Sequence, residues 1–361
     1  MQRLRFGTST MQTDRIEQTR QIVVPPGQAP ERIDRYITRS VLRATRNRVQ
    51  AAIDTGAVLV NGLVTKANYR VRPGDSIVIT LMKPPPIALV PQDIPLDIVF
   101  EDEDLFVVNK PSGMVTHPGF GNREGTLVNA ALFHVGGRLL PAPVDVVDDL
   151  EEIDEDDIAD QELDGAADVG VRPGIVHRLD KETSGLMVVA KNAVAQAHLA
   201  RQFAERTARR EYHAVAWGSL KDDEGEIEGN IARDSRDRKR FAVVRRGGRY
   251  ALTRWRVVRR FPFATLIALR LATGRTHQIR VHCAHIGHPL FGDPTYGGRN
   301  VVYQGPGGRH RQHVANLLDV MRRQALHARS LGFSHPRTNE WMEFERPYPD
   351  DMQMLVELLG M

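Results

Sequence analysis

Residues 145–164, DVVDDLEEIDEDDIADQELD, place a strong limit on how this chain can fold. The stretch holds 12 acidic residues and no Lys or Arg within 20 positions. It has no aromatic residue and too few large apolar groups to bury the surface that folding requires. We therefore expect residues 141–170 to be a disordered acidic insertion, with folded structure on either side of it.

The charge of the remaining chain indicates a polyanionic partner. The 361 residues carry a net charge of +4 with His neutral. Setting aside the 12 acids of the insertion leaves the other residues near +16. A chain this basic is typical of proteins that bind nucleic acid. On charge alone, a well-solvated basic surface is the alternative.

Composition narrows the class of protein further. Hydrophobic residues make up 41% of the chain, which is ordinary for a globular protein long enough for two or three domains. No apolar run approaches the roughly 18–20 residues of a membrane span, and the N-terminus lacks the apolar core of a signal peptide. The single cysteine, Cys283, excludes an intrachain disulfide. We expect a cytoplasmic monomer that does not bind membranes.

The N-terminal part of the chain divides into an arm, a small domain and a linker. Residues 1–28 are polar and lack sustained periodicity, so we expect a disordered arm. Helical patterns followed by Asn61-Gly62 between apolar flanks, a strong hairpin signal, place a compact domain at 31–83. Three consecutive prolines make 84–93 a stiff linker.

This compact domain resembles the S4 RNA-binding domain over about 50 residues, through the motifs GAVLVNG and YRVRPGD. The resemblance implies that basic residues of the second helix and its approach contact structured RNA by shape and phosphates. These residues are Arg43, Arg46 and Arg48. The alternative is a small domain whose basic helix is only solvated.

Residues 94–361 mix strand-like and helix-like patterns without regular βαβ alternation. IVFEDEDLFVVNK is a strand, an acidic turn and a strand; NAVAQAHLARQFAER is helical; REYHAVAWG and FATLIALRLAT are strand-like. This order predicts an α+β domain with a mixed, largely antiparallel sheet and flanking helices. A second insertion, basic and rich in Gly, occupies 298–323.

Five further motifs, in one order, carry a more specific resemblance. They are NKPSGMVTHPG, RPGIVHRLDKETSGLMVVAK, REYHAVAWG, LATGRTHQIRVHCAHIGHPLFGDPTYG and QALHARSLGFSHP. Together they are similar to the RluA/RluD-type pseudouridine synthases, over about residues 31–351 with the S4-like domain in front. The resemblance implies an RNA pseudouridine synthase that uses no cofactor and no metal. Its implied substrate is large-subunit (23S) ribosomal RNA, because the members that act there carry the S4 domain.

The same resemblance assigns roles to individual residues. Asp180 of HRLD matches the catalytic aspartate, Tyr212 the active-site tyrosine, and Arg280 of HQIR the arginine that pairs with that aspartate. Arg178 matches the arginine that can fill the gap left by a flipped base. We also assign Lys110 to RNA binding.

The assigned residue types suit the chemistry. Pseudouridine formation breaks the C1′–N1 bond of uridine, rotates the uracil and rejoins it through C5, with no net redox change. It needs an ionised carboxylate at the ribose, either as nucleophile or to assist elimination to a glycal, and the residues leave both routes open. Cations near Asp180 would lower its pKa, and the target base must first leave its stack.

Four other functions fit parts of the sequence. One is metal ligation, suggested by His277, His282, Cys283, His285 and His288. On a helix from Thr276 to about Gly287, however, only His282 and His285 share a face, which is too few ligands for a zinc site.

Another alternative is a glycoside hydrolase, with Glu182 as the second acid. On an extended strand Glu182 would lie about 7 Å from Asp180. The low aromatic content, 6%, counts against sugar binding. An RNA-binding ribosome-assembly factor and a transfer RNA pseudouridine synthase also fit the basic chain.

Overall fold

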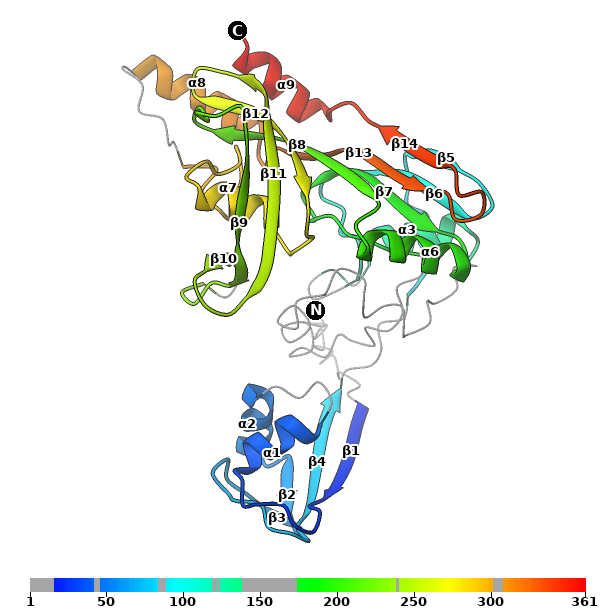
Figure 1. Ribbon diagram of the computed structural model, residues 1–361, viewed down its shortest axis with the longest axis vertical. Helices are drawn as coiled ribbons and strands as arrows, with labels where there is room; N and C mark the ends of the chain where they lie inside the picture. The colour runs from blue at the N-terminus through cyan, green and yellow to red at the C-terminus, as the bar shows by residue number, and fades with distance from the viewer. Residues whose placement is uncertain are drawn as a thin grey trace, which may run out of the picture. The chain divides into compact units, whose positions relative to one another are not determined.

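The computed structural model describes residues 16–41, 46–83, 89–118, 122, 124–137, 174–237, 240–300 and 308–361. These residues fall into two compact units, one ending at Lys83 and the other beginning at Leu89 (Figure 1). Within these ranges, no helix combines the length and the apolar character that crossing a membrane would need. The predicted acidic insertion, 141–170, lies outside the described residues.

The smaller unit is an antiparallel sheet with two helices packed on it. Its strands lie in the order β1-β4-β2-β3. They are β1 (Ile16–Val23), β2 (Val58–Val60), β3 (Leu63–Val64) and β4 (Ser76–Lys83). The helices are α1 (Ile33–Ser40) and α2 (Arg46–Asp54). Ile33 and Ile37, four residues apart and therefore on one helical face, are buried in the same core as Ile77 of β4.

Asn61 and Gly62 form the hairpin predicted from the sequence. They are the two residues between β2 and β3, and their φ values of 51° and 82° both lie in the left-handed region. A two-residue loop with both φ values positive is the type I′ geometry, which Asn-Gly favours.

The predicted disordered arm, 1–28, is wrong for residues 16–23. These residues form β1, which pairs antiparallel with β4 from Ile16↔Lys83 to Val23↔Ser76. The strand is polar because it lies at the edge of its sheet, and its partner is about 60 residues further along the chain. The polar composition of residues 16–23 therefore indicated disorder, although their backbone hydrogen bonds to β4 make them a strand.

The larger unit is built on one sheet in the order β10-β9-β11-β12-β8-β13-β7-β6-β5, with β14 paired to β13. Its strands are β5 (Ile98–Glu101), β6 (Leu105–Lys110), β7 (Ser184–Ala190), β8 (Arg209–Trp217), β9 (Glu224–Arg233), β10 (Phe241–Val244), β11 (Arg249–Arg260), β12 (Ala264–Leu271), β13 (Leu326–Ser334) and β14 (Trp341–Glu345). β13 and β7 pair in parallel, and the other strand pairs are antiparallel. The α+β prediction with a mixed, largely antiparallel sheet is confirmed.

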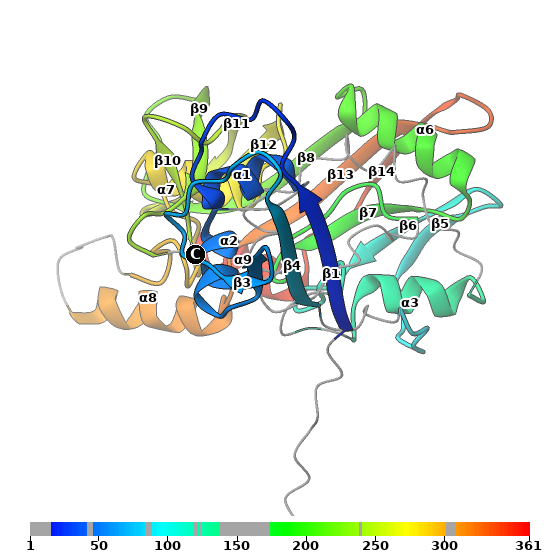
Figure 2. The same cartoon turned by 90° about the horizontal axis from the view of Figure 1, so that it is seen from below.

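Helices cover both faces of this sheet. They are α3 (Leu127–His134), α6 (Ala193–Ala204), α7 (Gln278–His285), α8 (Gly308–Val320) and α9 (Asp350–Leu359). Alternate residues of β8 point to opposite faces: Tyr212 packs in the core with α3 and α7, whereas Trp217 packs with α8 and α9. In Figure 2, α3 and α6 lie on opposite sides of β6 and β7. The face that carries Tyr212 is the one that forms the candidate site.

The basic insertion predicted at 298–323 contains a helix that the sequence patterns did not indicate. Its described residues form α8, whose Val314 and Leu317 are buried against the sheet. Residues 301–307 lie outside the described part of the chain.

Candidate active site

The segment HRLDKETSG places Asp180 at the first position of a tight turn. The backbone N–H of Thr183 donates to the carbonyl of Asp180 at 3.0 Å, and β7 begins at the next residue, Ser184. The chain enters the turn from Ile175, which bridges to Val189 of β7. The backbone of Asp180 is therefore anchored by the sheet, while its carboxylate lies beyond the N-terminal end of β7.

Two neighbouring segments fix the backbone of this turn. The carbonyl of Lys181 accepts the N–H of Gly113 at 2.9 Å and the ammonium of Lys110 at 3.2 Å. The carbonyl of Glu182 accepts Nη1 of the buried Arg323 at 2.9 Å. Asp180 therefore has little freedom to move with its backbone.

Arg280 contacts the carboxylate of Asp180 directly. Its Nη1 donates to Oδ2 of Asp180 at 3.1 Å, from the third residue of α7. Its Nε and Nη2 donate to the two oxygens of Asp293 at 2.7 Å and 3.0 Å. Asp293 is fully buried and also accepts the backbone N–H groups of Thr295 and Tyr296. The guanidinium is thus held between two carboxylates.

The electrostatics of the site favour an ionised Asp180. Burial by itself would raise the pKa of this carboxyl, but His277, Arg280 and Arg178 outweigh it and hold the pKa below its usual value. Burial would likewise lower the pKa of Arg280, but Asp293 and Asp180 raise it above its ordinary value. The side chain of Asp180 is 19% exposed, so the anion still reaches the pocket.

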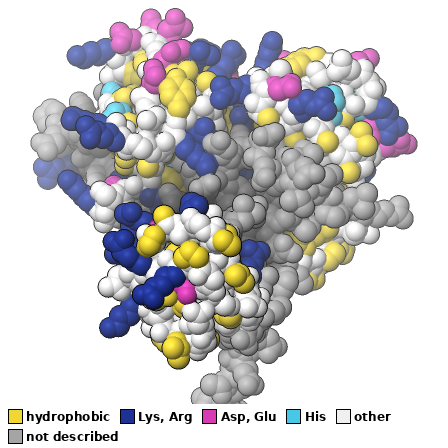
Figure 3. Space-filling model, turned by 60° about the horizontal axis from the view of Figure 1, so that its bottom comes forward, with side chains coloured by type: hydrophobic (Ala, Val, Ile, Leu, Met, Phe, Trp, Pro, Cys, Tyr) yellow, Lys and Arg dark blue, Asp and Glu magenta, His cyan; other side chains and the backbone are white. Residues whose placement is uncertain are grey.

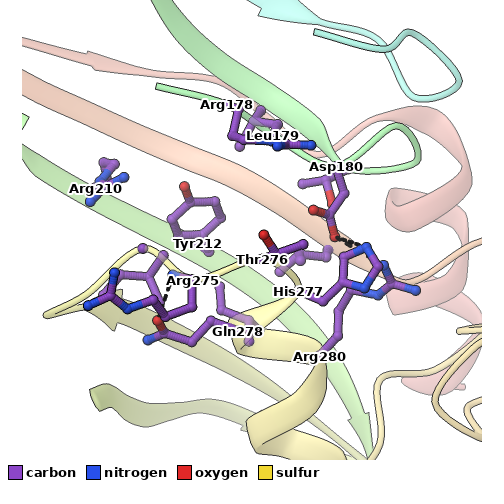
Figure 4. A pocket seen from close by; sticks show the side chains of 15 residues that line it. Arg178, Leu179, Asp180, Arg210, Tyr212, Arg275, Thr276, His277, Gln278 and Arg280 are labelled. Carbon is purple, nitrogen blue, oxygen red and sulfur yellow. Dashed lines mark hydrogen bonds and ion pairs between the residues drawn. The ribbon is translucent and has the colours of Figure 1, made fainter. Parts of the chain in front are cut away.

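A pocket brings Tyr212 together with Asp180 (Figure 4). Tyr212 comes from β8, where it is paired with Leu269 of β12 and with Ala328 of β13, and it is 5% exposed. Asp180 reaches the same pocket from the turn before β7. An aromatic ring and an anionic oxygen thus line one opening, although they come from different parts of the sheet.

Arginines line the rest of this opening. Arg178 is exposed, and Arg210 and Arg275 are partly exposed at the same pocket. Arg210 lies over the ring of Phe203 at 5.1 Å. Three cations around one carboxylate and one aromatic ring suit a ligand that carries both phosphates and a flat base.

The family of the chain follows from comparisons with known proteins. Residues 104–285 match the model of the RNA pseudouridylate synthases, and residues 31–77 match the S4 domain. An RNA pseudouridine synthase of Chlorobaculum parvum is 45% identical over 91% of this chain and 94% of its own length. The chain belongs to the RNA pseudouridine synthase family. It is an isomerase, as predicted.

Two further relatives extend this comparison. The ribosomal large subunit pseudouridine synthase D of Zymomonas mobilis is 40% identical over 94% of this chain and 98% of its own length. The chloroplastic RNA pseudouridine synthase 2 of Oryza sativa is 41% identical over 93% of this chain and 81% of its own length.

The RNA contact predicted for Lys110 of this synthase is wrong. The side chain is 0% exposed, and its ammonium donates to the carbonyls of Pro111, Met114 and Lys181 at 2.9, 2.8 and 3.2 Å. Burial lowers the pKa of Lys110 to about 7, opposed by the charge of Asp180. Lys110 therefore supports the turn of Asp180 from inside the protein and is not exposed on its surface.

The predicted RNA contacts of the S4-like unit are only partly described. Arg43 and the side chain of Arg48 lie outside the described residues. Arg46 donates from Nε to Asp34 at 3.1 Å. Asp34 is fully buried, and hydrogen bonds from Arg32, opposed by burial and assisted by Arg46, hold its pKa well below its usual range. Arg46 therefore has a structural partner in addition to any role toward RNA.

The histidine-rich segment serves three separate purposes. His277, not Thr276 as expected, occupies the N-cap position of α7. His282 is buried and contacts Thr253 Oγ1 through Nδ1 at 3.0 Å. His288 bonds the carbonyl of Trp217 through Nδ1 at 2.7 Å. These three side chains therefore face three different partners.

One group elsewhere in the described residues has the spacing of metal ligands: Asp102, Asp104 and His335. Its atoms already have partners, because Asp104 binds the guanidinium of Arg337 with both oxygens and His335 Nε2 lies 2.8 Å from Asp102 Oδ2. These contacts join the loop between β5 and β6 to the loop after β13.

Sequence reasoning missed two residues at the active site, Asp293 and His277. Asp293 lies 13 positions after its partner Arg280, at no fixed motif offset, in the segment GDPTYG. His277 was considered only as a metal ligand, a packing residue or an RNA contact, yet its Nε2 lies 3.8 Å from Asp180 Oδ2. A buried Arg beside a single catalytic Asp could have signalled a second carboxylate, because a buried cation needs compensation.

Proposed function

We propose that this synthase isomerises specific uridines of large-subunit (23S) ribosomal RNA, with Asp180 as the carboxylate that acts at the ribose. One observation carries the assignment of Asp180. Arg280 and His277 both make their closest approach to this carboxylate at Oδ2, and no described residue makes a hydrogen bond with Oδ1. The anion is therefore held by one oxygen and offers the other to the pocket.

The reaction uses this anion at C1′ of the target uridine. The C1′–N1 bond breaks, the uracil rotates, C5 bonds to C1′, and the proton from C5 leaves while N1 gains one, so atoms and charge balance. Asp180 either forms the bond to C1′ transiently or assists the loss of a proton from the sugar. Either role needs the ionised form, and the lowered pKa of Asp180 supplies it at neutral pH.

The other pocket residues hold the substrate. The ring of Tyr212 offers a face on which the freed uracil can stack. Arg178, exposed at the opening, fills the gap that the flipped nucleotide leaves in its helix. Arg210 and Arg275 meet the flanking phosphates. Figure 3 displays many Lys and Arg side chains on the described surface, which supports an RNA partner.

The preference for ribosomal RNA rests on two supports. One is the S4 domain, and the other is the similarity to proteins named ribosomal large subunit pseudouridine synthase D. We further propose that the protein acts as a cytoplasmic monomer without cofactor or metal, because the reaction is redox-neutral and a carboxylate suffices. An RNA-binding factor without catalysis is disfavoured, because binding alone does not require Asp180, Tyr212 and Arg280 at one pocket.

The test maps pseudouridines in cellular RNA with and without the gene. We expect defined 23S positions to lose pseudouridine on deletion, to regain it with the wild-type gene, and not to regain it with Asp180→Asn, which keeps the side-chain size but not the charge. The purified variant should bind RNA within a few-fold of wild type. Losses confined to transfer RNA would overturn the proposed substrate, and restoration by Asp180→Asn would overturn the role of Asp180.

A further inference from the structure

His277 lies beside the reactive carboxylate, and the mechanism above uses it only as a neighbour of Oδ2. Its Nε2 is 3.8 Å from Oδ2 of Asp180, the same oxygen that Arg280 binds at 3.1 Å. The imidazole is 24% exposed, so it forms part of the wall of the pocket (Figure 4). A ring at this distance can reach the carboxylate with a small movement.

The other ring nitrogen of His277 is held by Tyr296. Nδ1 lies 2.9 Å from the hydroxyl of Tyr296, which is itself 5% exposed. The same hydroxyl oxygen accepts the backbone N–H of Phe241, the first residue of β10, at 3.0 Å. Asp180, His277, Tyr296 and Phe241 thus form a continuous chain from the pocket to the sheet edge.

This chain of contacts assigns the proton of the imidazole. A backbone N–H can only donate, so the Tyr296 oxygen is an acceptor toward Phe241. The single hydroxyl proton of Tyr296 is then available to His277, and Nδ1 is its acceptor among the described residues. Burial raises the pKa of Tyr296 to about 12, so the hydroxyl keeps that proton at neutral pH. In the neutral form of His277, the ring's own proton is therefore on Nε2, toward Asp180.

The backbone at His277 is costly for a residue with a side chain. Its φ of 55° and ψ of 18° lie in the left-handed region, where Gly and Asn are favoured. The neighbouring Gln278 holds the helix start rigidly: its Oε1 accepts from Thr273 and from the N–H of Arg275, and its Nε2 donates to Thr253. The contacts of Gln278 thus hold the backbone of His277 in a conformation that favours Gly or Asn, and this fixes the position of the imidazole.

We propose that His277 is a positioning residue that donates its Nε2 proton to Oδ2 of Asp180 when RNA is bound, with Tyr296 setting the tautomer. The inference rests on the proposed role of Asp180. Catalytic hydrogen bonds are often long before substrate binds, and the 3.8 Å separation closes in the complex. Together with Arg280, His277 then holds Oδ2 and keeps Oδ1 directed at the ribose.

Two substitutions at position 277 separate this role from a structural one. His277→Gln places an amide donor near the position of Nε2, whereas His277→Asn places its amide near Nδ1 and cannot reach Asp180. Asn fits the left-handed backbone better than Gln. A residue needed only for the fold of the α7 start would therefore favour Asn, and a residue needed for its Nε2 proton would favour Gln.

The measurement is the single-turnover rate of pseudouridine formation on saturating RNA, with RNA affinity measured in parallel on the full-length protein. We expect His277→Asn to slow the reaction roughly tenfold or more, as loss of a hydrogen bond to a charged group does. His277→Gln should retain several times the activity of the Asn variant, and both should keep wild-type RNA affinity. Asn equal to or faster than Gln, or a matching loss of affinity, would overturn the proposal.

Tyr296→Phe tests the tautomer without touching His277. It removes the hydroxyl that donates to Nδ1, so the imidazole proton is no longer directed to Nε2, and the rate should fall severalfold at unchanged RNA affinity. A wild-type rate in this variant would remove Tyr296 from the proposal. Asp180→Asn is measured alongside: if that variant were active, the role of Asp180 itself would fail, whatever the order of Gln and Asn.

Discussion

Asp293 binds Arg280 through both of its oxygens while Arg280 binds Asp180 through a separate nitrogen. The distances are 2.7 Å and 3.0 Å to Asp293, and 3.1 Å to Asp180. Asp293 is fully buried, whereas Asp180 reaches the pocket. The buried carboxylate of Asp293 thus fixes the orientation of the guanidinium. The guanidinium in turn fixes the position of the Asp180 carboxylate.

Asp293→Asn should weaken both the fold and the reaction. Removing one partner of a buried ion pair leaves a buried cation less compensated, which costs about 3–5 kcal/mol when no other anion is near; here Asp180 offsets part of that cost. We expect a loss of about 2 kcal/mol in the free energy of unfolding, measured by denaturant titration, and a fall in the single-turnover rate. Glu226→Gln, at an exposed pair with Arg254, is the control and should change stability by less than about 1 kcal/mol. Equal stability of the two variants would contradict the role given to Asp293.

Lys110 should make stability depend on pH above neutrality. Its pKa is about 7 in the folded protein, below the ordinary value of 10.5, so between these values the unfolded chain holds a proton that the folded chain has released. Raising the pH through this window therefore stabilises the fold. Lys110→Met cannot titrate, and the difference in unfolding free energy between wild type and this variant should grow in favour of wild type from pH 7 to pH 9.

Lys181→Met serves as the control for Lys110, because Lys181 lies in the same turn and is exposed. Its unfolding free energy should follow the wild-type pH dependence. Lys110→Met should also be less stable than wild type at neutral pH by about 2 kcal/mol, because the carbonyls of Pro111 and Met114 lose the ammonium as donor and that of Lys181 keeps only the N–H of Gly113. Parallel pH curves for wild type and Lys110→Met would show that Lys110 does not titrate in this range.

Gly185→Ala should disrupt the start of β7, directly after the turn of Asp180. The residue has a φ of 121°, and a Cβ placed there would lie 2.3 Å from the carbonyl oxygen of Ala328 on the neighbouring strand β13. We expect a loss of several kcal/mol, measured by thermal unfolding. Gly136→Ala is the matched control: its φ of 64° is also positive, but no atom lies within 4 Å of the added Cβ, so the cost should be about 1–2 kcal/mol. Similar losses at both positions would show that backbone conformation alone, not the close approach of Ala328, makes Gly185 necessary.

Replacing Arg43 and Arg48 of the S4-like unit should change RNA affinity, whereas replacing Arg46 should also change the stability of this unit. Replacing Arg43 and Arg48 by Ala should reduce the slope of log affinity against log salt by about 0.7–0.9 for each phosphate that the variant no longer binds. Arg46→Ala should in addition lower the thermal stability of this unit, because the buried Asp34 loses one of its donors and keeps Arg32. An unchanged salt slope in the double variant would show that Arg43 and Arg48 do not face RNA.

Local signals in the sequence were sufficient for some elements of the fold. The Asn61-Gly62 hairpin follows from the φ values that those two residues tolerate. The pairing of Arg280 with Asp180 was implied by the family resemblance, not by a local signal, and the two side chains are found 3.1 Å apart.

Features that depend on distant packing were not predictable from the same signals. A polar segment such as β1 becomes a strand only because β4 offers its free edge. Lys110 was assigned to RNA binding, but three carbonyls from the turns around it bind its ammonium inside the protein. The pairing of Asp293 with Arg280 requires the loop after α7 to fold back, and no periodic pattern encodes that return.

The position of β13 has a consequence for the order in which the enzyme becomes active during its own synthesis. β13 lies between β8 and β7, and its Ala328 is paired with Tyr212 on one side and with Gly185 on the other. The ring of Tyr212 and the turn of Asp180 are therefore joined through a strand that is synthesised more than 100 residues after either of them. A nascent chain without β13 lacks the strand between the two sides of the pocket, so the pocket is assembled only after β13 has left the ribosome.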